Sequence, residues 1–137
     1  MDILSVKSGV IVHQVNCQGV MGAGIALKIK RKWPVVFERY RKFKFKLGYV
    51  QFIEVATGLW VCNLAGQDRY GRDKQYTDYD AVAEGFRKLN VWASERDLKI
   101  YIPKGMGCSN AGGDWEVIDK LILEILVDCE VHICRQF

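Results

Sequence analysis

The sequence lacks long hydrophobic runs, paired-cysteine motifs and a supply of histidine. No apolar run among the 137 residues is long enough to cross a bilayer, and we find no cleavable signal ahead of the first predicted strand. The five cysteines form no CxxC pair, and Cys62 and Cys134 lie in apolar strand-like runs, so we expect free buried thiols in a reducing cytoplasm. Because His13 and His132 are the sole sources of imidazole ligands, we expect no metal site. We also expect no cofactor.

Internal repeats, linkers and low-complexity segments are also missing. A chain of 137 residues, half of them hydrophobic, can bury a core without disulfides, so we predict one domain over residues 1–137. Strand-like runs alternate with helical patterns, which favours a three-layer α/β/α sandwich. The predicted strands are 10–12, 49–56, 59–64, 98–102 and 130–134. The predicted helices are 25–33, 35–46, one from a cap at Thr77 or Asp78 to Trp92, and one from a cap at Asp114 to Val127.

The stretch from Val10 to Pro34 organises the rest of the chain. It starts as an apolar strand, continues through the polar residues His13, Gln14 and Asn16, and passes a glycine-bearing turn before a helix. Small residues let the backbone approach an anion, and a helix N-terminus presents unpaired N–H groups. Because the glycine spacing matches neither the dinucleotide fold nor the P-loop, a ligand loop and a structural turn both fit this pattern.

A second glycine-rich loop, 103–115, lies between a predicted strand and a predicted helix. Its four glycines are hard to explain by packing alone. Two such loops can converge on one anion, which suits a diphosphate because that group needs several backbone N–H donors. A third loop, 65–73, is polar and follows the C-terminal end of a strand, where ligands bind in open α/β sheets.

The first loop carries a family resemblance. Its motif His13-x-x-Asn16-Cys17-x-Gly19-x-x-Gly22-x-Gly24-Ile25-Ala26 resembles the first ligand loop of macrodomains, most closely in the ADP-ribose-1''-phosphate phosphatase branch. The stretch Asn63-Leu64-x-x-Gln67-Asp68-x-Tyr70-Gly71, followed by Thr77-Asp78-Tyr79, resembles phage and bacterial members of that branch. The resemblance covers nearly the whole chain and implies a mixed central sheet with both glycine loops at one edge. The family's first strand would be missing, because Asp2-Ile3-Leu4, similar to the segment that ends it, stands at the start of the sequence.

The resemblance also implies site residues. His13 and Asp68 would position water and protonate the departing ribose oxygen, and Asn16 would hold the ribose hydroxyls, so these three are the predicted catalytic residues. From the residues alone, His13 also fits a satisfied strand-end imidazole, Asp68 a turn former and Asp2 a cap. The predicted ligand-binding residues are Asp2, whose carboxylate would accept a hydrogen bond from the adenine amino group, Ile3, Gly22, Ala23, Gly24, Ile25, Gly107, Cys108, Ser109, Asn110, Ala111 and Gly112.

A different class of macrodomain removes ADP-ribose from protein carboxylates or from DNA bases. By resemblance, those enzymes use a lysine after the strand that corresponds to 59–64, and some add an aspartate in the second loop. Here Gly66 or Gln67 stands at the lysine position and Ala111 at the aspartate position, while Lys74 lies further out. These differences count against that chemistry, although the segment GVMGAGIALKIKRKWP, 19–34, resembles the DNA-acting enzymes closely.

Charge is concentrated between Lys28 and Lys46, where nine basic residues stand against Glu38 alone. This basic block could contact nucleic acid or an anionic ligand, but we favour a solvated helix face. As function, we predict the hydrolysis of ADP-ribose-1''-phosphate to ADP-ribose and phosphate by a monomeric protein without a membrane partner. The alternatives are a non-catalytic reader of ADP-ribose, poly(ADP-ribose) or nucleic acid, and a de-ADP-ribosylating hydrolase.

Overall fold

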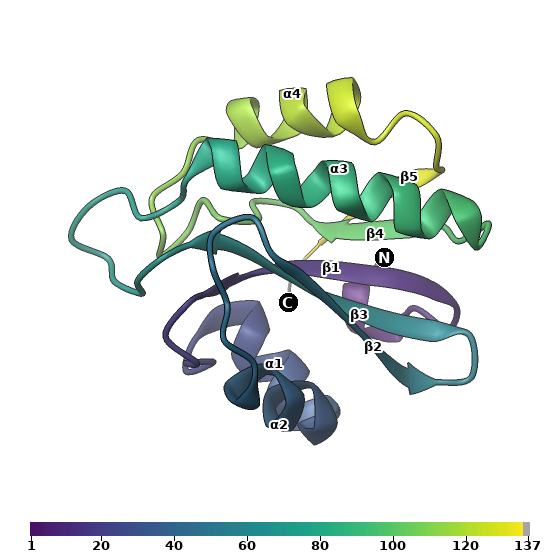
Figure 1. The fold of residues 1–137 in the computed structure, drawn as a ribbon, viewed down its shortest axis with the longest axis horizontal. Helices are drawn as coiled ribbons and strands as arrows, with labels where there is room; N and C mark the ends of the chain where they lie inside the picture. The colour runs from purple at the N-terminus through teal and green to yellow at the C-terminus, as the bar shows by residue number, and fades with distance from the viewer. Residues whose placement is uncertain (136–137) are drawn as a thin grey trace.

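The computed structural model describes residues 1–135 and contains one five-stranded sheet in the order β2-β3-β1-β4-β5 (Figure 1). The strands are β1 (Gly9–Asn16), β2 (Val50–Ala56), β3 (Leu59–Gln67), β4 (Ile100–Pro103) and β5 (Val131–Cys134). β1 is parallel to both β3 and β4, and β4 is parallel to β5, whereas β2 runs antiparallel to β3. The carboxyl ends of β1, β3 and β4 therefore meet at one edge of the sheet.

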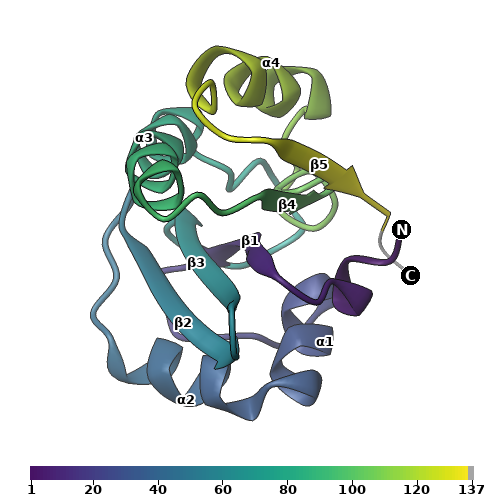
Figure 2. The ribbon, with the colours of Figure 1, turned by 90° about the vertical axis from the view of Figure 1, so that its right-hand side faces the viewer.

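Helices cover both faces of this sheet. α1 (Gly24–Lys32) and α2 (Pro34–Lys42) pack below it in Figure 1, and α3 (Tyr79–Glu95) and α4 (Trp115–Ile125) pack above it. Figure 2 shows the same layers from the side, with the 3₁₀ helix η1 (Ile3–Ser5) close to α1. The arrangement confirms the predicted three-layer α/β/α architecture with a mixed sheet. None of the helices in residues 1–135 has the length and apolar character that a membrane span requires.

Strand β1 lies at the centre of the sheet and contributes to two hydrophobic cores. Ile11 and Val15 belong to the cluster that includes side chains of α1 and α2, and Val10 and Val12 belong to the cluster under α3 and α4. Successive side chains of a strand point to opposite faces. The polar residues at the end of β1 therefore also divide between the two faces.

Local signals set several element ends as predicted. The Asp78 carboxylate accepts a hydrogen bond from the Ala81 N–H at 3.0 Å and caps α3, and Asp114 accepts one from the Glu116 N–H at 2.9 Å and caps α4. The predicted hairpin between β2 and β3 turns at Gly58, whose φ is +76°.

Other boundaries differ from the prediction. α2 ends at Lys42 instead of continuing to residue 46, because the chain becomes extended at Phe43 and buries Phe45 in the core. β1 and β3 are longer than predicted, since they stay paired in parallel as far as Asn16 and Gln67. α3 is three residues longer than predicted and α4 two residues shorter.

At the N-terminus, Asp2 forms a single parallel bridge with Arg135, and β1 is the first strand of the described residues. The five cysteines are free, and Cys62 and Cys134 are buried as predicted. Burial raises the pKa of the Cys62 thiol. Within residues 1–135, no group of three His, Cys, Asp or Glu side chains is arranged to hold a metal ion.

Candidate ligand-binding site

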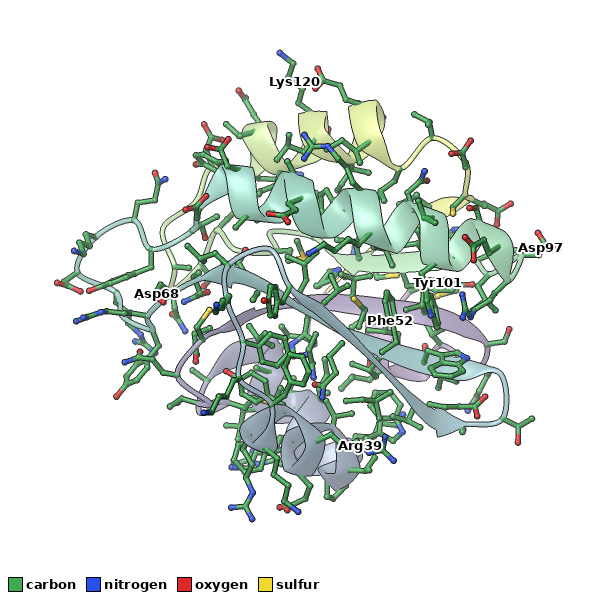
Figure 3. All side chains as sticks on the ribbon, in the orientation of Figure 1. Arg39, Phe52, Asp68, Asp97, Tyr101 and Lys120 are labelled. Atoms are coloured by element: carbon green, nitrogen blue, oxygen red, sulfur yellow. The ribbon has the colours of Figure 1, made fainter. Side chains whose placement is uncertain are left out.

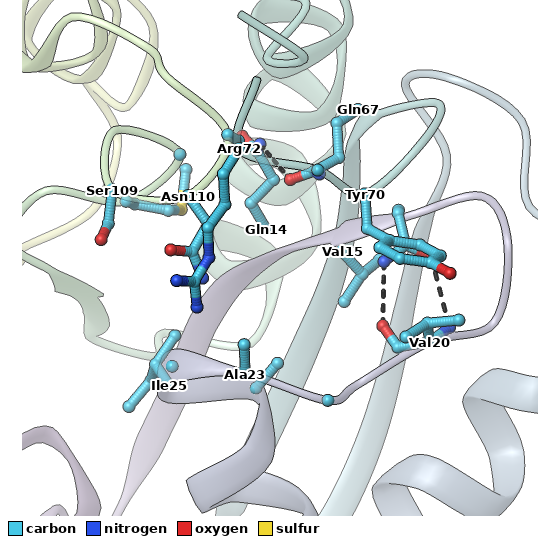
Figure 4. A pocket seen from close by; sticks show the side chains of 18 of the residues that line it. Gln14, Val15, Val20, Ala23, Ile25, Gln67, Tyr70, Arg72, Ser109 and Asn110 are labelled. Carbon is cyan, nitrogen blue, oxygen red and sulfur yellow. Dashed lines mark hydrogen bonds between the residues drawn. The ribbon is translucent and has the colours of Figure 1, made fainter. Parts of the chain in front are cut away.

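A cavity of about 400 Å³ opens where the carboxyl ends of β1, β3 and β4 meet (Figure 4). Four segments line it: the end of β1, the loop that leads into α1, the loop after β3, and the loop after β4. The residues that line it are Gln14, Val15, Asn16, Val20, Gly22, Ala23, Gly24, Ile25, Ala26, Gln67, Tyr70, Gly71, Arg72, Gly105, Met106, Gly107, Ser109, Asn110 and Ala111. The predicted convergence of both glycine loops at one sheet edge is therefore present in the structure.

Asn16 holds the first loop in shape. Its Oδ1 accepts hydrogen bonds from the Gln18 and Val20 N–H groups at 3.0 and 3.3 Å, and its Nδ2 donates to the Val20 carbonyl at 2.9 Å. The Tyr40 hydroxyl donates to the same residue from α2, and burial raises the pKa of Tyr40 to about 12. Asn16 lines the cavity, but both polar atoms of its side chain are already bonded to the protein.

The N-terminus of α1 faces the cavity without a side-chain cap. Ala23 occupies the N-cap position and supplies no side-chain hydrogen bond, so the first N–H groups of the helix have no side-chain acceptor. Gly24 has a φ of +58°, and a Cβ at this position would meet nothing within 4 Å. A helix terminus of this kind attracts an anion through its N–H groups and its dipole.

The second loop is shaped by close contacts with neighbouring polar groups. Gly107 has a φ of +75°, and a Cβ there would lie 2.6 Å from the Gln14 Oε1. The Gly107 carbonyl accepts hydrogen bonds from the Thr77 hydroxyl at 2.6 Å and from the Gly113 N–H at 2.9 Å. The left-handed backbone conformation favours glycine at position 107, and a larger residue there would also have to displace the Gln14 amide.

A network of amides forms one wall of the cavity. The Gln14 Nε2 donates to the Gln67 Oε1 at 2.8 Å and to the Thr77 hydroxyl at 2.9 Å, and the Gln67 Nε2 donates to the Arg69 carbonyl at 2.8 Å. The Gln14 Oε1 is buried and has no hydrogen-bond partner in the described residues. By resemblance, Gly66 or Gln67 stands where de-ADP-ribosylating macrodomains carry a lysine, and of these two Gln67 lines the cavity with its amide.

Arg72 supplies the charge of the site. Figure 4 shows its side chain beside Asn110, with the guanidinium extending toward the start of α1. Of the cavity-lining residues in the described part of the chain, it alone carries a formal charge, and its side chain makes no hydrogen bond or ion pair within residues 1–135. An unpaired guanidinium next to backbone N–H groups favours a phosphate-bearing ligand.

His13 lies away from this cavity. It is fully buried, and its Nε2 is 2.5 Å from the Asn63 Oδ1, while the Asn63 Nδ2 donates to the Gln51 Oε1 at 3.0 Å. Since the Asn63 Oδ1 must accept, the network assigns the imidazole proton to Nε2 and leaves the buried Nδ1 unpartnered. Burial lowers the pKa of His13 to about 4, against a smaller opposing effect of the Asn63 hydrogen bond. The imidazole is therefore neutral near pH 7 and out of reach of a ligand in the cavity.

Asp68 does not meet His13 either. It lies at one end of the molecule, opposite the end that carries Asp97 (Figure 3), and its exposed carboxylate is 3.9 Å from the Arg69 guanidinium. It contributes to the site through its backbone, because its carbonyl accepts a hydrogen bond from the Cys17 N–H at 3.0 Å. The structure therefore does not assemble the predicted acid–base pair.

The remaining predicted residues divide into two groups. Gly22, Ala23, Gly24, Ile25, Gly107, Ser109, Asn110 and Ala111 line the cavity. Asp2, Ile3, Cys108 and Gly112 lie outside its lining. The Asp2 carboxylate caps η1, and Ile3 is fully buried in the core. The sequence analysis assigned no role to four residues that line the cavity: Gln14, Tyr70, Arg72 and Met106. Two of them could have been found, since Gln14 is a polar residue on a strand and Arg72 is a cation in a loop that contains glycine.

Comparisons with known proteins identify the fold. No protein-family model matches the chain. A protein of unknown function from Bacteroides thetaiotaomicron is 30% identical, with a TM-score of 0.90 over 98% of this chain and 94% of that one. A macrodomain protein from Streptomyces coelicolor is 28% identical, with a TM-score of 0.81 over 97% and 91% of the two chains. DarTG of Thermosipho africanus, solved with ADP-ribose, has a TM-score of 0.78 at 18% identity over 95% of this chain and 38% of that one. The chain has the macrodomain fold.

The curated relatives carry names that specify an activity. The DNA ADP-ribosyl glycohydrolase of Mycobacterium tuberculosis is 29% identical over 134 residues, which include 89% of this chain. A protein with the same description from Thermus aquaticus is 26% identical over 133 residues and 91% of this chain. In both cases the match spans 36% of the relative, so this chain corresponds to about a third of the length of the curated proteins it matches.

Proposed function

We propose that this chain binds ADP-ribose in the cavity between the two glycine loops and hydrolyses the bond that joins ADP-ribose to DNA. That residues 1–137 form a single macrodomain, that the protein is monomeric and that it is cytoplasmic remain predictions. The observation that carries the binding part is the convergence of an uncapped helix N-terminus, a second glycine loop and the unpaired Arg72 on one cavity of about 400 Å³. Backbone N–H donors and a guanidinium together suit a diphosphate.

The macrodomain fold and the curated relatives support the ADP-ribosyl part of the proposal. Hydrolysis would add the hydroxyl of water to the terminal ribose carbon, break the bond from that carbon to the base nitrogen, and leave the proton on the base. The cavity lining in residues 1–135 contains no carboxylate, imidazole or lysine. In the proposed reaction this chain would act by holding the diphosphate on backbone donors and Arg72 and by orienting water against the amide of Gln67, which Gln14 holds in place.

A second candidate is the hydrolysis of ADP-ribose-1''-phosphate, which the resemblance of the first loop to the phosphatase branch favours. Arg72 also supports it, since a guanidinium at the cavity binds a phosphate monoester as well as a diphosphate. In that reaction water would attack the phosphorus, and the ribose oxygen would leave with a proton.

One assay distinguishes these possibilities. Single-stranded DNA that carries ADP-ribose on a base and ADP-ribose-1''-phosphate are incubated separately with the protein, and released ADP-ribose and phosphate are measured. The proposal expects faster release of ADP-ribose from DNA, and no release by the Gly24→Glu variant. Faster phosphate release would favour the second candidate. Binding of ADP-ribose without either reaction would overturn the enzymatic part and leave a reader of ADP-ribose.

A further inference from the structure

The basic block forms a charged surface on the layer of α1 and α2. Residues 28–46 carry nine Lys or Arg side chains against one carboxylate, and the rest of the chain carries eleven cations against fifteen carboxylates. The protein is therefore strongly positive on one layer and net negative elsewhere. A separation of this kind steers a polyanion to one side of a protein.

Most of the cations of this surface have no side-chain partner within residues 1–135. Glu38 pairs with Arg41 at 3.3 Å, and Lys30 and Arg41 also lie over the Phe37 ring. The side chains of Arg39 and Lys42 are exposed and make no hydrogen bond, ion pair or ring contact in the described residues. A solvated helix face explains their exposure but not the near absence of acidic neighbours.

A second hollow lies within this surface. It has a volume of about 370 Å³ and is lined by Val35, Glu38, Arg39, Lys42, Phe43 and Gln51. The Phe43 ring is 44% exposed and is held edge-on by Phe45, with 4.8 Å between ring centroids. A fixed, exposed aromatic ring between unpaired cations can stack an unpaired base while the cations contact the flanking phosphates.

We propose that this surface binds single-stranded nucleic acid, with a base on Phe43 and phosphates on Arg39 and Lys42. α2 is also tied to the cavity, because Tyr40 bonds to Asn16 and a Cβ at Gly19 of the first loop would lie 4.0 Å from the Arg41 Cα. The helix that would carry the strand is therefore the helix that also contacts the first loop of the cavity. This link rests on the proposed function, whereas binding of an unmodified strand does not.

The test is fluorescence anisotropy with an unmodified single strand of about 12 nucleotides and with the matching duplex, over a range of salt concentrations. The test variant is Arg39→Gln with Lys42→Gln. The control is Arg87→Gln with Lys120→Gln, which removes the same charge from the α3 and α4 layer; Figure 3 shows Arg39 and Lys120 on opposite sides of the molecule. The steepness of log affinity against log salt should fall by about 1.4 in the test variant, since each phosphate contact on a single strand contributes about 0.7. The control should retain the wild-type slope.

Phe43→Ala should weaken single-strand binding about fivefold or more and leave its salt slope unchanged, because stacking carries no charge. Leu123→Ala, which truncates an exposed apolar side chain on α4, is its control. Equal losses in test and control variants, or tighter binding of the duplex, would overturn the proposal. All variants should keep the wild-type shift in melting temperature with ADP-ribose, so failure of the DNA surface and failure of the ADP-ribose site are distinguished.

Discussion

Two polar clusters occupy neighbouring positions on β1 but opposite faces of the sheet. Gln14 belongs to the cavity, where its amide bonds to Gln67 and Thr77 beside open space. His13, one residue earlier, is sealed in the core on the α1 and α2 side with Asn63. A polar residue at a strand end is therefore not sufficient evidence for a site, because the packing around its side chain decides between ligand binding and stability.

The largest expected effect is a loss of ADP-ribose affinity from a change in the cavity alone. Gly24→Glu places a carboxylate at the start of α1, where a Cβ meets nothing within 4 Å, and should lower ADP-ribose affinity at least about 100-fold by repulsion of the diphosphate. Gly24→Ala, with the same backbone strain but no charge, and Gly58→Glu, with a charge at the distant hairpin, should both bind far better. Calorimetry measures all three, and unchanged affinity in Gly24→Glu would mean that the anion lies elsewhere.

Gly112→Glu is not an equivalent test. A Cβ at Gly112 would lie 3.1 Å from the Lys74 carbonyl oxygen, so a substitution there crowds the neighbouring backbone. If that variant lost binding, the result would not show whether the loop had been displaced or the glutamate had repelled the ligand.

The second expected effect is a loss of stability from a change in the buried His13 cluster alone. His13→Ala should destabilise the protein by about 3 kcal/mol, because it leaves a void and an unpaired Asn63 Oδ1, while ADP-ribose affinity stays close to that of the wild type. Denaturant unfolding and calorimetry measure the two quantities. A large loss of ADP-ribose affinity with little loss of stability would show that His13 does contribute to the ligand-binding site.

The same residue gives stability a pH dependence. The unfolded imidazole takes up a proton near pH 6.5, whereas the folded one stays neutral down to about pH 4. Between these values protonation favours the unfolded state, so His13 should lower the free energy of unfolding by about 1.4 kcal/mol per unit of falling pH. His13→Ala should lose this part of the acid slope, and His132→Ala, which alters an exposed imidazole, should retain it.

A smaller effect tests the charge of the cavity. Arg72→Gln should lower ADP-ribose affinity about tenfold and reduce its salt dependence, because a charge-assisted contact with the diphosphate is lost. Arg69→Gln is the matched control, since Arg69 pairs with Asp68 and does not line the cavity. Equal affinity in both variants would exclude Arg72 from the contact with phosphate.

The smallest expected effect concerns the amide wall. A Cβ at Gly66 would lie 2.5 Å from the Gln14 Oε1 and 2.9 Å from the Val82 Cγ2, so Gly66→Ala should destabilise the protein by about 1 kcal/mol. In the double variant, Gln14→Ala should restore part of the lost stability, because it removes the atom that the Cβ at position 66 would crowd, the Gln14 Oε1. Gly22→Ala, whose nearest neighbour would be 3.8 Å away, is the control; additive effects of Gly66→Ala and Gln14→Ala would contradict the crowding.

The sequence was informative wherever a local pattern has one physical cause. Glycines between a strand and a helix predicted the two loops, and Asp78 and Asp114 predicted helix starts, because caps and left-handed turns depend on few neighbours. The three-layer architecture followed from the alternation of strands and helices, whereas the mixed sheet was implied by the family resemblance.

The placement of single side chains depends on tertiary contacts that no local pattern reports. Both faces of β1 are apolar, with Val10 and Val12 on one side and Ile11 and Val15 on the other. Residue parity puts His13 on the side of Ile11 and Val15, but it could not show whether that position is sealed in the core or open to a ligand. Arg72 reaches the cavity because its loop is closed by the Tyr76 N–H bond to the Ala111 carbonyl at 2.7 Å, a contact between distant segments.

Titration calorimetry of the wild-type protein with ADP-ribose tests the central claim most directly, with AMP as the comparison ligand. The account predicts one site per chain that ADP-ribose fills more tightly than AMP, because AMP lacks the second phosphate and the terminal ribose that the two glycine loops and Arg72 would hold. Absence of heat at millimolar ADP-ribose, or equal affinity for the two ligands, would contradict it.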